Sequence, residues 1–222
     1  MTTKSYIIAK QSTTIKKKLL ILQQLQQLHN MKSPETINKI EAVVLYILQS
    51  FKEGVDYIKL FKIMYFAQRK FLATYGMTIF DDTFKARLRG PVPALTYKVV
   101  KIAETGTGRK EHKDLSRFVK SIRIESKDGH QMVFATQQPN VEYISAMARK
   151  TLDWAVAEYG SKNSDELSEL THDNIYDEVK ERMKDDPQKD IFTLIDIARS
   201  GGASEAMIEH IREKQIIKNA LS

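Results

Sequence analysis

Hydrophobic residues recur every three or four positions along most of this chain, a spacing typical of α-helices with one buried face. One segment departs from this pattern, because the only charged residues in 57–67 are Lys59 and Lys62, which share one narrow stripe. A helix that is apolar over the rest of its circumference is buried by neighbours on several sides. We therefore expect a central helix, capped by Asp56 and ended by Gly76, with the rest of the chain packed around it.

Shorter amphipathic helices are predicted on both sides of the central one. The first begins at Ser33-Pro34, with serine at the cap and proline at the first helical position. Ser164 is expected to cap a short helical turn in the second half of the chain. The remaining helices are expected at 93–104, 141–159, 173–184, 190–199 and 204–219. The inner face of the helix at 141–159 is expected to consist of Val141, Ile144, Ala148, Leu152, Ala155 and Tyr159.

One segment changes to the alternating pattern of strands. Asp128-Gly129 separates two alternating runs, which predicts a hairpin with a type I′ turn. This turn pairs Lys127 with His130 and places Ile124 opposite Val133, so that the apolar side chains share one face. The predicted fold class is mainly α (α+β), a helical bundle around a buried central helix with one small antiparallel β-hairpin.

The formal net charge of +7 is concentrated near the amino terminus. Residues 1–32 hold six lysines and no acidic residue, which leaves about +1 for the other residues. We therefore divide the chain into a basic amphipathic N-terminal helical arm, 1–32, and a single helical domain with C-terminal helices, 33–222. A body that binds nucleic acid through phosphates would carry a basic face across the fold, and the composition of 33–222 does not indicate one.

The arm carries an apolar stripe that its own length cannot bury. Such stripes are covered by a partner, by a second copy of the chain or by the domain itself. We interpret the stripe as partner-facing, with docking on the chain's own domain as an equal alternative. Its residues are Ile15, Leu19, Leu22, Leu25 and Leu28.

Composition excludes several classes of protein. The chain of 222 residues is 42% hydrophobic, enough for one compact domain, and it has no cysteine, which excludes disulfides and thiolate chemistry. No apolar run approaches the roughly 20 residues needed to cross a bilayer, and no apolar region follows the first lysines as in a secretory signal. We expect a cytoplasmic protein with no membrane partner.

Candidate catalytic groups are few. The five histidines never fall at metal-ligand spacing, and no nucleophile elbow is present. Asp81-Asp82 is the best carboxylate pair and could bind Mg²⁺ in a metal-dependent hydrolase, but aspartates in turns usually accept backbone N–H bonds. No third acidic ligand lies nearby, so we favour the structural role. The sequence predicts no enzyme, no cofactor and no metal.

Two separated blocks of the sequence carry a more specific pattern. The first contains Tyr65-Phe66-Ala67-Gln68, Phe80-Asp81-Asp82-Thr83-Phe84 and Gly90-Pro91-Val92, and the second runs from Glu166 to His172. In this order they resemble the signature of the Panacea, or SocA-like, antitoxin domain of type II toxin–antitoxin systems and phage-associated proteins. The positions that match its motifs are Tyr65, Phe66, Gln68, Asp82, Phe84, Gly90, Pro91, Val92, Thr171 and His172.

The resemblance covers about residues 37–183 and has two departures. Arg89 stands where the family has a tyrosine or a similar residue before Gly-Pro-Val. A tryptophan that often follows the Thr-His pair is absent, and Ile175 and Tyr176 stand there instead. Neither change alters the fold that the resemblance implies.

The resemblance implies a non-catalytic antitoxin that neutralises a cognate protein toxin by direct protein–protein binding. On physical grounds we expect most of the motif residues to be scaffold, because aromatic side chains on a buried helix usually pack in the core. A homo-oligomer is a further partner that the apolar stripe allows. The alternative function is a nucleic-acid-binding regulator that acts through the basic arm.

Overall fold

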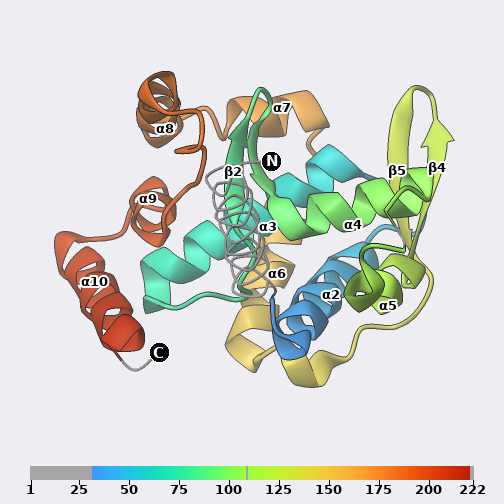
Figure 1. Ribbon diagram of the computed structural model, residues 1–222, viewed down its shortest axis with the longest axis horizontal. Helices are drawn as coiled ribbons and strands as arrows, with labels where there is room; N and C mark the ends of the chain where they lie inside the picture. Colours follow the sequence, from blue (N-terminus) through green and yellow to red (C-terminus); the bar gives the residue numbers. More distant parts are fainter. Residues whose placement is uncertain (1–31, 109, 221–222) are drawn as a thin grey trace, which may run out of the picture. The chain divides into compact units, whose positions relative to one another are not determined.

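A computed structural model describes residues 32–108 and 110–220 of the chain (Figure 1). The described residues from Glu35 onward form one body. Its α-helices are α2 (Pro34–Leu48), α3 (Tyr57–Tyr75), α4 (Ala94–Thr105), α5 (Ser116–Lys120), α6 (Ala146–Tyr159), α7 (Ser164–Glu169), α8 (Asn174–Asp185), α9 (Leu194–Ser200) and α10 (Glu205–Ala220). Its strands are β1 (Val55–Asp56), β2 (Phe84–Arg87), β3 (Gly90–Pro93), β4 (Ile122–Lys127) and β5 (His130–Ala135). None of the helices in this described part is long and apolar enough to cross a membrane.

Helix α3 is the centre of the body, as its nearly all-round apolar sequence predicts. Asp56 caps its first turn by accepting hydrogen bonds from the backbone N–H groups of Ile58 and Lys59. Gly76 ends it in the left-handed conformation, with φ of 60°, and donates its N–H to the carbonyl of Leu72. Helices α6 and α9 and the hairpin β2–β3 pack around it. The predicted fold class, mainly α with small antiparallel β elements, is confirmed.

The predicted hairpin forms with the predicted register. Lys127 pairs with His130 and Ile124 with Val133 across β4 and β5. Asp128 and Gly129 both have positive φ, 50° and 80°, as a type I′ turn requires. The short strand β1 pairs with β5 and makes the sheet three-stranded.

A second hairpin lies between the central helix and the helix predicted at 93–104, where the sequence predicted no strand. Strands β2 and β3 pair antiparallel, with Lys85 opposite Val92 and Arg87 opposite Gly90. The outer edge of β2 is taken by a later segment, because Ala86 N–H donates to the carbonyl of Asp190 at 2.7 Å. Strand β3 is therefore an edge strand, and this position tolerates its two prolines.

Several predicted helix starts are shifted, by one residue at α7 and by about one turn at α6 and α9. Residues Val141–Tyr143 form a short 3-10 turn, and α6 begins after Ser145, whose side chain accepts the Ala148 N–H. Val141 is 44% exposed and does not belong to the buried face. Helix α7 is capped by Asn163 rather than Ser164, through a reciprocal hydrogen-bond pair with Glu166. The segment before Leu194 is extended because it pairs with β2.

The two helices nearest the carboxyl terminus complete the packing around α3. Tyr65 donates its hydroxyl hydrogen bond to Ser200 Oγ at 3.2 Å. A side chain at Gly201 would collide with the Arg69 carbonyl, and one at Gly76 would meet Met207 and His210 of α10. Residues beyond position 190 are therefore part of the same body as α3.

Candidate functional site

The two motif blocks meet at the buried side of α3. The Lys62 ammonium donates a hydrogen bond to the Pro91 carbonyl at 3.3 Å. Gly90 has φ of +94°, and a Cβ atom there would lie 2.5 Å from Lys62 Nζ and closer still to Thr171 Oγ1. Only glycine allows this approach without strain. The hairpin β2–β3, the end of α7 and α3 are thus joined at one point.

Lys62 is a cation buried in a mostly apolar core. It is 1% exposed, and the described residues offer its ammonium a carbonyl oxygen but no carboxylate ion pair. Burial, followed by repulsion from the Arg89 guanidinium, lowers the pKa of Lys62 from 10.5 to about 7. A buried group that loses its charge near neutral pH couples this junction to pH.

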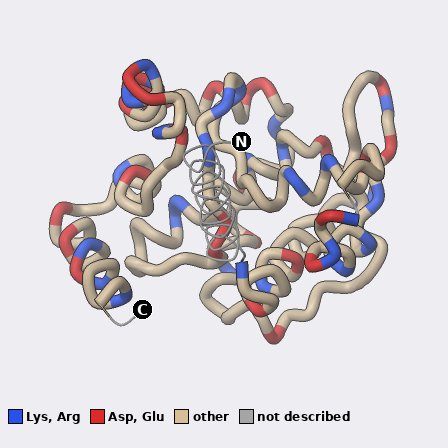
Figure 2. Tube along the Cα trace, in the orientation of Figure 1, with Lys and Arg blue, Asp and Glu red and all other residues tan. Residues whose placement is uncertain are grey.

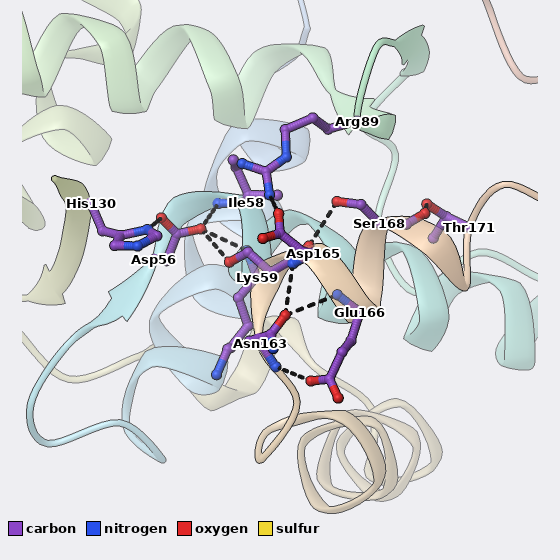
Figure 3. A network of polar contacts seen from close by, with 11 residues as sticks. Asp56, Ile58, Lys59, Arg89, His130, Asn163, Asp165, Glu166, Ser168 and Thr171 are labelled. Atoms are coloured by element: carbon purple, nitrogen blue, oxygen red, sulfur yellow. Dashed lines mark hydrogen bonds and ion pairs between the residues drawn. The ribbon is translucent and has the colours of Figure 1, made fainter.

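A chain of hydrogen bonds links the second motif block to the start of α3 (Figure 3). Thr171 Oγ1 donates to the Ser168 carbonyl at 2.8 Å, and Ser168 Oγ donates to the Ser164 carbonyl at 2.7 Å. Ser164 Oγ then donates to Asp56 Oδ1 at 2.7 Å, and His130 Nδ1 lies 3.3 Å from the other oxygen of Asp56. The same carboxylate that caps α3 therefore also holds α7 and β5 in place.

Two motif residues, Asp82 and Gln68, hold loops in place. Asp82 accepts the N–H groups of Leu95 and Thr96, each at 2.9 Å, and the Thr96 hydroxyl at 2.8 Å, so it caps α4. Burial raises the pKa of Asp82, and these hydrogen bonds oppose the rise. Gln68 accepts the Ile79 N–H at 3.0 Å and donates to the Phe80 carbonyl at 3.2 Å, which ties the segment after α3 back onto it.

The motif aromatics are in the core. Tyr65 and Phe84 meet edge to face with ring centroids 5.3 Å apart, and Phe66 stacks on Tyr159 at 4.0 Å. Tyr65, Phe66 and Phe84 are each at most 1% exposed. Their contribution is packing, about 2 kcal/mol or more for each fully buried aromatic ring.

These contacts agree with a family comparison. The family model described as "Antitoxin SocA-like, Panacea domain" matches residues 60–177, more than half of the chain and all of the motif positions above. The chain belongs to this family. No curated protein and no solved structure matches it.

The Panacea domain leaves an exposed surface beside the buried junction. Leu88, at the turn of β2–β3, is 88% exposed, and Leu170, at the end of α7, is 47% exposed. The exposed His172 ring stacks on Tyr176 at 4.3 Å, and the Tyr176 hydroxyl donates to the Arg87 carbonyl at 2.9 Å. The hairpin turn and the Thr-His segment are therefore held together beneath this surface.

Arg87 and Arg89 of the hairpin form ion pairs with residues that are distant in the sequence. Arg87 and Arg89 lie five to eight residues after Asp81 and Asp82 in the sequence, close enough for a local ion pair. In the Panacea domain Arg87 instead pairs with Asp190 at 2.8 Å, and Arg89 pairs with Asp165 of α7 (Figure 3). Both pairs join segments far apart in the sequence, so local spacing could not reveal them.

Two candidates from the sequence remain, a metal site and the apolar stripe of the amino-terminal arm. Within 32–108 and 110–220, no group of three or more histidine, aspartate or glutamate side chains could hold a metal ion. The proposed partner-facing stripe (Ile15, Leu19, Leu22, Leu25 and Leu28) lies outside the described residues, so its role stays a prediction. Val92 is the one motif residue of β3 that is only partly buried, and it faces a groove of the Panacea domain described below.

Proposed function

We propose that this chain is an antitoxin that neutralises a cognate protein toxin by direct protein–protein binding, without catalysis. The family match over residues 60–177 carries the proposal. A toxin is the partner that this family implies.

The use of the motif residues supports a binding role. Two buried groups that could act as an acid, a base or a ligand hold the fold instead: Asp82 caps α4, and Lys62 is enclosed beneath Gly90 and Pro91. A catalytic group has to reach a substrate, and these two side chains are at most 7% exposed. With these two groups buried, the domain can contact a partner only through other, exposed side chains, which suits an inhibitor that binds by the shape and charge of its surface.

The test is co-expression of the chain with the product of the gene next to its own. Growth rescue together with a complex that survives size-exclusion chromatography is expected. A His172→Gln variant, which removes the exposed imidazole of the Thr-His segment, should rescue as well as the wild type if that group has no catalytic part. A harmless neighbouring product that does not co-purify would contradict the proposal.

The basic amino-terminal arm favours a second candidate, a nucleic-acid-binding regulator. Residues 1–32 hold six lysines without an acidic residue, whereas Lys, Arg, Asp and Glu are interspersed over the described body (Figure 2). A salt-dependent mobility shift that disappears when Lys16, Lys17 and Lys18 become glutamine would support it. Absence of any shift at low salt would remove it.

A further inference from the structure

A groove of about 480 Å³ lies between the hairpin β2–β3 and α4. One wall is formed by Lys85, Arg87 and Val92 of the hairpin. Lys85 and Val92 are cross-strand partners, and Arg87 lies two residues from Lys85, so the three side chains share one face of the pleat. The opposite face of the same strand, with Phe84 and Ala86, is buried in the core.

The other wall is a single stripe of α4. Ala94, Tyr97, Lys98, Lys101 and Ile102 recur at the three- and four-residue spacing of one helix face, and all of them line the groove. Two walls of regular structure, joined directly at Pro93-Ala94 and fixed by the Asp82 cap, make the groove a preformed feature.

The groove is rimmed by positive charge. Lys85 and Arg87 share one counter-ion, Asp190, and their side chains remain 36% and 49% exposed. Lys101 pairs with Glu104, whereas Lys98 is exposed and forms no ion pair with a carboxylate of the described residues. None of the residues that line the groove is acidic.

The groove also has an apolar floor. Ile102 is 4% exposed and Val92 is partly buried, so both present aliphatic carbon at its base. The Tyr97 ring is 42% exposed and rests edge-on against Phe61, with centroids 6.2 Å apart. A rigid, half-exposed tyrosine beside buried aliphatic side chains is the kind of anchor that protein interfaces use.

We propose that this groove is the docking site for an acidic segment of the partner protein, with an apolar side chain against Tyr97 and Val92 and carboxylates on Lys85, Arg87, Lys98 and Lys101. The proposal rests on the antitoxin function above and names the face through which the toxin is bound. Charge complementarity selects the occupant, since four cations face two internal carboxylates. A nucleic acid fits less well, because the floor is apolar and residues 33–222 carry only about +1 in total.

The first experiment measures binding of the neighbouring gene product to the full chain and to groove variants. The double charge reversal Lys98→Glu with Lys101→Glu is expected to weaken binding by about tenfold or more and to flatten its salt dependence. Tyr97→Ala should weaken binding at all salt concentrations, since it removes an apolar anchor. Thermal melting confirms that each variant is folded, as expected for exposed side chains.

Two control variants locate the effect. Lys127→Glu reverses one exposed charge at the end of β4, outside the groove, and should bind as the wild type does. Leu88→Asp alters the exposed turn of β2–β3 outside the groove. If the wild type binds the toxin, and only Leu88→Asp weakens the complex, the groove proposal is wrong while the antitoxin function stands.

The second experiment tests the groove without the toxin. A fluorescent peptide of glutamates around one phenylalanine is titrated with the full chain, alongside a single-stranded oligonucleotide. Saturable peptide binding that the Lys98/Lys101 reversal abolishes is the expected result. Failure of the peptide to bind would overturn the proposal. Binding of the oligonucleotide that the same reversal abolishes would also overturn it. Both results hold whether or not the neighbouring product is a toxin.

Discussion

Replacement of Lys62 by methionine should remove a pH dependence from the stability of the domain. The pKa of Lys62 falls from 10.5 in the unfolded chain to about 7 in the folded one, mainly because the ammonium is buried. Each pH unit between the two pKa values corresponds to about 1.4 kcal/mol, so the buried charge costs on the order of 5 kcal/mol below pH 7. Methionine is unbranched like lysine and one atom shorter, and it carries no charge.

The sign of the pH effect follows from proton binding. Between the folded and unfolded pKa values the unfolded chain holds the Lys62 proton and the folded chain does not, so the free energy of unfolding rises with pH. From pH 7 to pH 9 the rise for the wild type is about 2 kcal/mol. The increase should be absent in Lys62→Met, and this variant should be the more stable protein at pH 7, despite losing the hydrogen bond to Pro91.

Urea unfolding at pH 7, 8 and 9, followed by circular dichroism, measures this difference. Lys59→Met is the matched control, since Lys59 lies one helical turn earlier on α3 and its ammonium donates to the Gly160 carbonyl at 3.1 Å. It should retain the slope of the wild type. Equal slopes for the wild type and Lys62→Met would refute the reasoning, because they would show that the ammonium is solvated in the folded protein.

Three further substitutions test the junction and its surroundings. Gly90→Ala should destabilise the domain by about 2–4 kcal/mol in urea unfolding, because the added methyl group overlaps its neighbours. Gly129→Ala is the control, since Gly129 has φ of +80° but open space around it, and it should cost about 1 kcal/mol. Equal losses of unfolding free energy in the two variants would contradict the packing argument. Gln68→Leu leaves two buried backbone groups unpaired and should cost about 2–4 kcal/mol; a thermally unchanged variant would argue against these hydrogen bonds. Burial raises the pKa of Asp196, but the bidentate ion pair with Arg182 and the cap of α9 outweigh it, so that the pKa is lowered. The ionised Asp196 carboxylate therefore stabilises the folded domain above about pH 4, and this contribution is lost on acidification. Asp196→Asn should therefore show a shallower decline in melting temperature from about pH 5 to pH 2, and an unchanged decline would exclude the pair as its cause.

The sequence predicted those parts of the fold whose pattern is local. The central helix, its glycine stop and the register of the Asp128-Gly129 hairpin follow from periodicity and turn chemistry within short windows. The strand β2 was missed because part of its pairing comes from Asp190, far along the chain. The prolines of β3 concealed the other strand, since proline usually argues against one.

The site was less accessible from sequence than the fold. Lys62 appeared as one of two charges on a helical stripe, and its burial depends on Gly90 and Thr171, which approach it only in the folded chain. The family motifs located Gly90 and Thr171 but did not show the close approach and the hydrogen bond by which these residues hold the fold. The groove was missed because the exposure of Tyr97 depends on which faces of α4 its neighbours leave uncovered.

The packing of α9 and α10 on the central helix has a consequence for synthesis on the ribosome. The family match ends at residue 177, yet Tyr65 and Arg69 are covered by residues near Ser200 that are made much later. At roughly 5–20 residues per second, the chain spends seconds with that flank of α3 still open after α3 itself has emerged. During this interval the apolar flank is available to chaperones and proteases. Cellular abundance of this protein should therefore respond to substitutions around Ser200 more strongly than their effect on the completed fold implies.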